Sequence, residues 1–81
     1  MNEIVRLNSI ERIKRLAALT EAAGLRVTAS DGSNTADAED VLGMIGLDLN
    51  SPISLHCVGE RSKIEQMLAL LRQEQEEGDS E

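Results

Sequence analysis

Three stretches of the chain alternate apolar and polar residues at every second position, which is the pattern of a half-buried β-strand. The clearest two are residues 25–30 and 53–58, and residues 4–7 form a shorter third. Turn-forming residues at positions 31–34 predict a hairpin into a further short strand at residues 35–37. The pattern therefore predicts four strands.

Two longer segments instead repeat apolar residues every three or four positions, as an amphipathic helix does. The first begins after Asn8 or Ser9, either of which can cap it, and ends before Gly24. Its apolar stripe, which is predicted to face the core, consists of Ile10, Ile13, Leu16, Ala17 and Thr20. The second helix begins near Ser62 and carries a stripe of Ile64, Met67, Leu68 and Leu71.

A third and much shorter helix is predicted between the hairpin and the last strand. Asp37 and Asp40 are both favourable N-cap residues, and the apolar residues that follow fit one or two helical turns better than a strand. Gly46 is expected to end this helix in the left-handed conformation, and Leu47 and Leu49 then alternate with a polar residue as in an extended segment. Because so short a helix nucleates poorly, its apolar residues must pack against a larger body or be kept for a partner.

The predicted element order is strand, helix, strand, strand, short helix, strand, helix. Half-buried strands with helices gathered on one face predict an α+β fold of the open-faced β-sandwich kind. A ferredoxin-like ligand-binding domain would lack the short helix before the last strand. One domain is expected over residues 1–73, because residues 74–81 are acidic and polar and are expected to be a disordered tail.

Composition narrows the classes of function. The chain has 15 acidic and 8 basic residues and a net charge of −7, so nucleic acid and anionic membrane surfaces are not expected as partners. It contains no Phe, Tyr or Trp, which excludes aromatic stacking on bases or sugars. One Cys cannot form an internal disulfide, and no signal peptide or apolar run of about 18 residues is present, which predicts a cytoplasmic protein.

Residues 35–49 resemble a segment of a known family. They read Thr-Ala-Asp-Ala-Glu-Asp-Val-Leu-Gly-Met-Ile-Gly-Leu-Asp-Leu, similar to the x-Asn/Asp-Ala-Lys-Ser-Ile-Met-Gly-x-x-x-Leu-x-x segment of HPr, the histidine-containing phosphocarrier of the phosphoenolpyruvate:sugar phosphotransferase system. Residues 53–58, the Gly-Glu pair at positions 59–60 and the helix after it resemble the family's last strand, turn and C-terminal helix. The resemblance covers roughly residues 25–71 and implies an HPr-like, four-stranded sheet covered by helices on one face.

The family's phosphoryl acceptor has no match in this chain. The resemblance implies a His at the amino end of the first helix, in a Gly-Leu-His-x-Arg-Pro motif, whereas positions 7–12 read Leu-Asn-Ser-Ile-Glu-Arg. A Ser9 phosphate ester would be too stable to pass on, and Glu11 would repel an incoming phosphoryl group, so Ser9 is interpreted as a helix cap. His56 lies on a strand and Cys57 faces inward, so no catalytic residue, metal ligand or cofactor is predicted.

Asp40 is the sharpest candidate for a functional residue. It stands where the resemblance implies a regulatory Ser, whose phosphorylation implies binding to a catabolite-control transcription factor. A fixed carboxylate would mimic phosphoserine in part, with one charge and two oxygens, and the alternative is that Asp40 only caps the short helix. Glu39 replaces the family's usual Lys, which makes this surface more acidic.

The sequence is interpreted as a cytoplasmic HPr-like protein that has lost phosphocarrier chemistry, acts by binding another protein and is not an enzyme. Its partner is expected to be a phosphotransferase-system component or a catabolite-control regulator. The predicted binding surface lies beside Asp40 and comprises Leu42, Ile45, Leu47, Arg12 and Arg15. Two alternatives stay open: a phosphocarrier with an atypical acceptor, and a small-ligand-sensing α+β domain.

Overall fold

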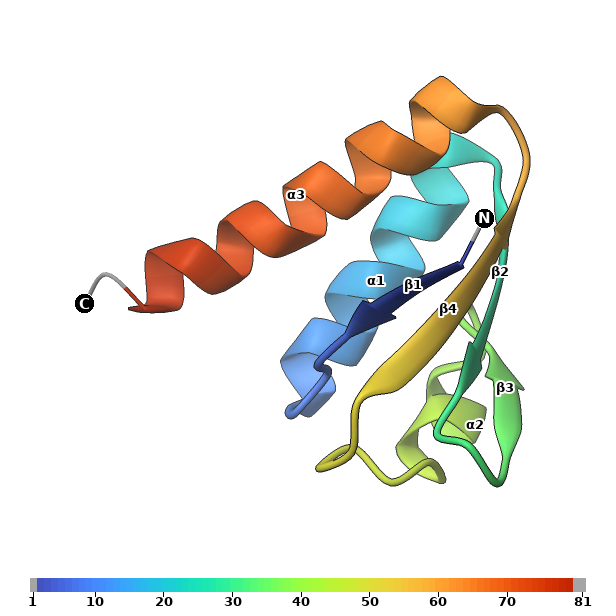
Figure 1. Cartoon of the computed structure of the whole chain (residues 1–81), viewed down its shortest axis with the longest axis vertical. Coiled ribbons are helices and arrows are strands. Elements are labelled where there is room, and N and C mark those ends of the chain that lie inside the picture. The colour runs from blue at the N-terminus through green and yellow to red at the C-terminus, as the bar shows by residue number, and fades with distance from the viewer. Residues whose placement is uncertain (1, 80–81) are drawn as a thin grey trace.

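A computed structural model of the chain shows a four-stranded antiparallel sheet and three helices (Figure 1), and it describes residues 2–79. The strands are β1 (Asn2–Val5), β2 (Arg26–Ser30), β3 (Thr35–Asp37) and β4 (Ile53–Val58). The helices are α1 (Ile10–Ala23), α2 (Val41–Ile45) and α3 (Arg61–Asp79). The α+β class and the predicted order of elements are therefore confirmed.

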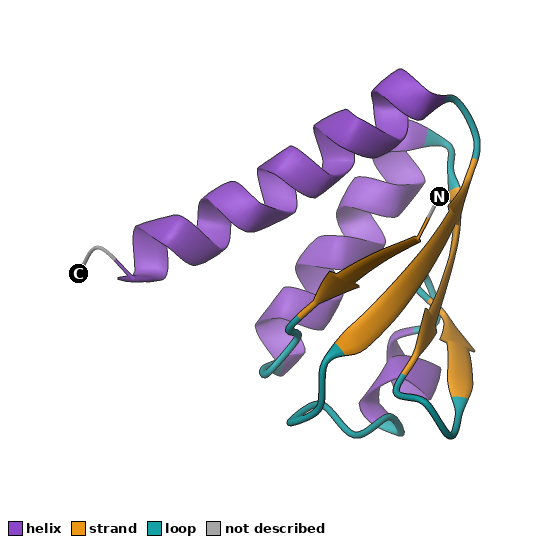
Figure 2. Cartoon of the chain, in the orientation of Figure 1, coloured by secondary structure: helices purple, strands orange, loops and turns teal. Residues whose placement is uncertain are grey.

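The sheet has the spatial order β1-β4-β2-β3, and every neighbouring pair of strands is antiparallel. The register places His56 of β4 between Asn2 of β1 and Thr28 of β2, and all three residues are exposed. The next residues along the central strands, Leu55 and Val27, are buried. The period of two therefore turns one face of the sheet to the core and leaves the other open to solvent (Figure 2).

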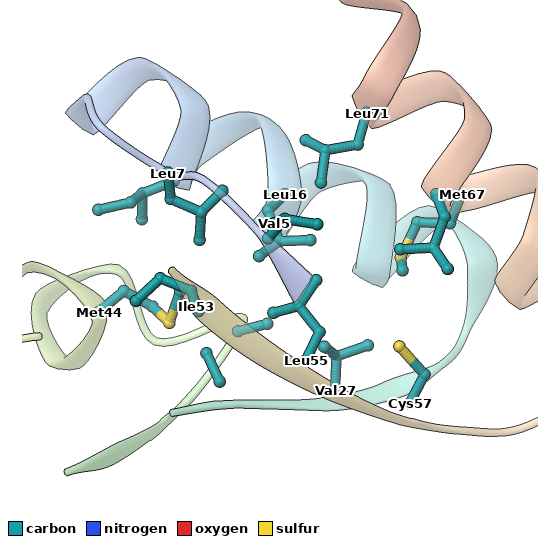
Figure 3. Close-up of a cluster of buried hydrophobic side chains, with 14 of the residues drawn as sticks. Val5, Leu7, Leu16, Val27, Met44, Ile53, Leu55, Cys57, Met67 and Leu71 are labelled. Atoms are coloured by element: carbon teal, nitrogen blue, oxygen red, sulfur yellow. The ribbon is translucent and has the colours of Figure 1, made fainter. Parts of the chain in front are cut away.

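The core fills the space between the buried face of the sheet and the helices. Figure 3 shows side chains from all three helices, among them Leu16, Met44 and Met67, pointing toward the strands. Aliphatic side chains and Met fill this space, because the chain has no aromatic residue. Thr20 is a buried polar residue, and its hydroxyl donates to the Met67 sulfur at 3.6 Å. This contact joins α1 to α3 and satisfies a hydroxyl whose burial would otherwise be costly.

Helix α1 begins and ends as predicted. Ser9 is its N-cap, and the Ser9 hydroxyl oxygen accepts the backbone N–H of Arg12 at 3.3 Å. Gly24 follows the last turn with φ 66°, in the left-handed region that glycine adopts without a steric penalty. Ile10 differs from its predicted place in the core, since it is 49% exposed. The buried stripe starts one turn later, at Ile13, and continues through Leu16 and Thr20.

The segment after α2 also differs from its prediction. Gly46 has φ −73° and is right-handed, and its N–H donates to the carbonyl of Gly43 at 3.1 Å. Leu47 and Leu49 do not form an extended segment, because residues 49 and 50 make a turn. The N–H of Ser51 closes this turn by donating to the carbonyl of Asp48 at 3.1 Å.

Strand β1, at one edge of the sheet, is joined to helix α3 by an ion pair. Strand β1 ends at Val5, two residues earlier than the alternation predicts, yet Leu7 in the following loop is still fully buried. Arg72 of α3 pairs with Glu3 of β1, with 3.3 Å between the guanidinium nitrogen and the carboxylate oxygen. Helix α3 continues to Asp79, past the boundary expected after residue 73. The expected disorder of residues 74–81 stays a prediction, and residues 80 and 81 lie outside the described part.

The hairpin between β2 and β3 is built around the carboxylate of Asp31. Its Oδ1 accepts the backbone N–H groups of Ser33 at 2.8 Å and Asn34 at 2.7 Å. Its Oδ2 accepts the N–H of Asp48, in the loop after α2, at 2.9 Å. These donors, with Asp48 the strongest, lower the pKa of Asp31 because they stabilise the charged form. Asp31 thus ties the hairpin to the loop that leads into β4.

We expect the stability of the protein to depend on pH through Asp31. Because the folded-state pKa lies below the ordinary value, the ionised carboxylate adds stability at neutral pH, and this contribution is lost as the pH falls through the folded pKa. Asp31→Asn should therefore lower the Tm at neutral pH, and the difference from the native chain should shrink below about pH 4. Thermal melts across this range test the expectation, with the exposed Glu21→Gln as the control. A difference that stays constant with pH would contradict it.

Candidate functional site

The candidate site is the solvent-facing side of helix α2. Asp40 caps this helix, since its Oδ1 accepts the N–H of Gly43 at 3.1 Å and its carbonyl accepts the N–H of Met44 at 2.9 Å. Met44 is fully buried and joins the core. A helix of five residues cannot hold itself in water, so the Asp40 cap and the buried Met44 side chain together keep α2 in place.

Gly43 lets the capping carboxylate approach the helix closely. A Cβ on Gly43 would lie 2.7 Å from Oδ2 and 3.1 Å from Cγ of Asp40, so the capping carboxylate would have to shift to make room for a side chain. Glycine at this position therefore leaves the cap undisturbed. The structure shows Asp40 as a helix cap. Phosphoserine mimicry stays a prediction, because a capping carboxylate and a phosphoserine mimic would both stand at this same end of the helix.

Two apolar side chains of α2 face solvent. Leu42 is 83% exposed and Ile45 is 41% exposed, and their spacing of three residues puts them on the same side of the helix. We call these two side chains the α2 patch. Leu47, which was predicted to belong to this surface, is only 6% exposed and lies in the core. Leu47 follows the turn at Gly46, and its N–H donates to the carbonyl of Met44 at 3.1 Å.

Arg12 and Arg15 lie on the side of α1 that faces α3. Arg12 precedes Arg15 by three residues and Arg15 precedes Leu19 by four, so the three side chains share one side of the helix. Leu19 lines a groove between α1 and α3. The Arg12 Nε–H donates to the carbonyl of Arg6 at 3.2 Å, which directs the guanidinium to the loop before α1. The structure therefore does not put the predicted basic flank next to the α2 patch.

Ile10 and Lys14 occupy the opposite side of α1; the sequence pattern put Ile10 in the core stripe and included neither residue in the predicted binding surface. They are one turn apart, and both are exposed. Helix α1 packs against α2, and Figure 1 shows the first turn of α1 at the same end of the molecule as α2. Ile10 thus adds exposed apolar surface at this end. The position of Ile10 directly after the Ser9 cap was the available signal, since a first helical residue often precedes the packed turns.

Three exposed carboxylates stand at the beginning of α2: Asp37, Glu39 and Asp40. The Asp37 Oδ1 accepts the backbone N–H of Glu39 at 2.9 Å, and Asp40 is the helix cap. Among the residues that the structure describes, ion pairs involve other carboxylates: Glu3 with Arg72, Glu60 with Lys63, and Glu65 with Arg61. The α2 patch therefore has an acidic border, formed by the residues that directly precede its helix.

His56 and Cys57 lie outside this site. His56 is exposed on the open face of the sheet, where its Nδ1 is 2.7 Å from Oδ1 of Asn2. Cys57 is buried, and burial raises the pKa of its thiol, which keeps it in the unreactive protonated form. Among the side chains that the structure describes, those of residues 2–73, no three His, Cys, Asp or Glu groups gather closely enough to hold a metal ion. None of the described helices is long and apolar enough to cross a bilayer.

Two hollows on the described part of the surface lie away from this site. One, of about 260 Å³, is the groove between α1 and α3, lined by Leu19, Ala22, Ala23, Lys63, Gln66, Met67 and Leu70. The other, of about 410 Å³, lies where β4 leads into α3 and is lined by Cys57, Gly59, Arg61 and Ile64. Each has at most two polar side chains in its lining, fewer than the converging polar groups that orient a small ligand in a binding site.

A scan against models of protein families and a search of curated proteins gave no match to this chain. The site is therefore interpreted from its own geometry: a capped short helix, two exposed apolar side chains and an acidic border.

We expect Asp40→Ala to destabilise the protein by about 0.5–2 kcal/mol, because the N–H of Gly43 loses its acceptor. Asp40→Ser should keep most of this stability, since a Ser hydroxyl can also cap the helix while the charge is lost. Chemical denaturation of the three proteins tests the pair of expectations. Equal stability of the Ala variant and the native chain would show that the cap is unimportant.

The Ser variant also tests phosphoserine mimicry. Loss of partner binding by the folded Ser variant would support phosphoserine mimicry, and unchanged binding would reject it.

Proposed function

We propose that this protein is an HPr-like regulatory module that binds another cytoplasmic protein through the α2 patch and does not relay phosphate. The observation that carries the proposal is the 83% exposure of Leu42 on a helix that the core otherwise holds in place. With Ile45 beside it, Leu42 supplies an apolar centre, and the carboxylates before the helix supply a charged rim. This combination suits a transient protein interface.

The sequence resemblance over residues 25–71 supports the family part of the proposal. The four-stranded antiparallel sheet and the three helices agree with the architecture that the resemblance implies. Since one fold serves many functions, the proposal takes its functional content from the site and not from the fold. A phosphotransferase-system component or a catabolite-control regulator is the partner that we propose.

The amino end of α1 supports the absence of phosphocarrier activity. A reversible carrier needs an imidazole there, where backbone N–H groups and the helix dipole stabilise a phosphoryl group. This chain has Ser9 at that position, and the Ser9 side chain accepts the N–H of Arg12 as an ordinary cap. His56 lies on the open face of the sheet, opposite to the face that α1 covers, and has no helix end to assist it.

Retention of a specific partner tests the proposed binding surface. We expect the immobilised full-length chain to retain a partner protein from the cytoplasm of its own cell, and Leu42→Asp to abolish this retention. Leu70→Asp changes a partly exposed apolar residue on α3 and serves as the matched control that should still retain it. Circular dichroism confirms that both variants are folded. Equal retention by the native chain and the Leu42 variant would refute a role for the patch.

Phosphorylation distinguishes the proposal from an atypical carrier. Incubation with phosphoenolpyruvate and the general phosphotransferase of a sugar-uptake system should give no acid-labile phosphorylated species by intact mass. The physical reason is that neither Ser9 nor His56 combines an imidazole with converging backbone donors. A gain of one phosphoryl group that is lost in acid and absent from His56→Ala would instead identify an unusual carrier.

A further inference from the structure

The charge around the α2 patch is one-sided. Asp37, Glu39 and Asp40 are exposed before the first turn of the helix, and the described ion pairs of the chain do not involve them. The exposed charges near Ile10 on α1 are Glu11 and Lys14, which offset each other. The three acidic residues that precede α2 therefore make the field beside Leu42 negative.

The three carboxylates differ in the hydrogen bonds that they accept. Asp37 and Asp40 each accept a backbone N–H, so their charges are fixed in position by the local fold. The Glu39 backbone is held through that bond to Asp37, while its carboxylate makes no hydrogen bond or ion pair within the described residues. Glu39 is thus the carboxylate of this border that can turn toward a partner without loss of a cap.

We propose that the α2 patch binds a protein whose apolar pocket is bordered by Lys or Arg side chains, and that Glu39 is the main residue that selects them. This inference rests on the proposed function and adds the chemistry of the partner. Leu42 enters the pocket, and Glu39 pairs with a cation on its border while Asp37 and Asp40 add to the attraction. Complementary charge of this kind speeds association and rejects partners of the wrong sign.

The same charges argue against the other classes of occupant. A phosphate backbone or an anionic lipid surface would bring negative charge to three carboxylates and would be repelled. An acidic protein surface would meet the same repulsion. A basic border is the chemistry that both the exposed Leu42 and its acidic neighbours fit.

Two synthetic amphipathic peptides test this inference. They share one Leu face and differ only in the polar face, which carries Lys in one and Glu in the other. Each is titrated into the ¹⁵N-labelled full-length chain, and amide chemical shifts report where it binds. We expect the Lys peptide to shift the amides of residues 39–46 at low salt, and the Glu peptide to bind about tenfold more weakly.

Variants separate the charge from the apolar contact. Glu39→Lys should weaken binding of the Lys peptide about tenfold, because it replaces an attraction by a repulsion. Glu21→Lys makes the same charge change at an exposed position near the far end of α1, and it should have an effect of less than about twofold. Leu42→Ser should weaken the binding of both peptides.

Each outcome decides one of the two proposals. Preference for the Lys peptide that Glu39→Lys removes and Glu21→Lys keeps would support the charge inference. Equal binding of both peptides, or an effect of Glu21→Lys as large as that of Glu39→Lys, would overturn it. If Leu42→Ser still weakens binding in that case, the proposed docking surface stands without the charge selection. Shifts that do not include residues 39–46 with either peptide would overturn the inference and count against the α2 surface as well.

Discussion

Burial of Met44 is the interaction on which the candidate site depends. Helix α2 has five residues, too few to be stable alone, and Met44 is its one fully buried side chain. The Asp40 cap adds a local hydrogen bond at the beginning of the helix, and Gly43 leaves the space that this cap needs. Met44 anchors the helix to the core and Asp40 caps its amino end. Leu42 and Ile45 can therefore stay exposed while the helix remains in place. That division suits a surface that binds and releases a partner.

Carboxylates accept several of the backbone hydrogen bonds that order the loops around α2. Asp31 accepts three backbone N–H groups and connects the hairpin to the loop after α2, while Asp37 and Asp40 order the chain before the helix. These groups explain part of the negative net charge without any reference to a partner. Glu39 is different, because its carboxylate serves no such local role. The acidic border is therefore partly structural, and Glu39 is the residue of this border on which our proposal of charge selection rests.

Local features were predictable from the sequence to within a residue or two. The strand at Ile53–Val58, the Ser9 cap and the Gly24 terminus of α1 depend on neighbours within one turn or on the period of two. The position of the candidate site could be predicted equally well, since its residues Asp40, Leu42 and Ile45 belong to one short helix and its cap. Leu47 was not, because it is buried after a turn in which Gly46 is right-handed in place of the expected left-handed conformation.

The sequence by itself thus determined the element order, the caps and the alternation of the sheet, since these follow from periodicity and short-range hydrogen bonds. Only the tertiary structure decided which side of α1 meets α2 and which meets α3. That choice puts Arg12 and Arg15 toward α3 and leaves Ile10 exposed at the end where α2 lies. A helical stripe identifies an apolar side but not the element that covers it. The neighbours of the α2 patch were therefore set by the way the helices pack on the sheet, which no local pattern encodes.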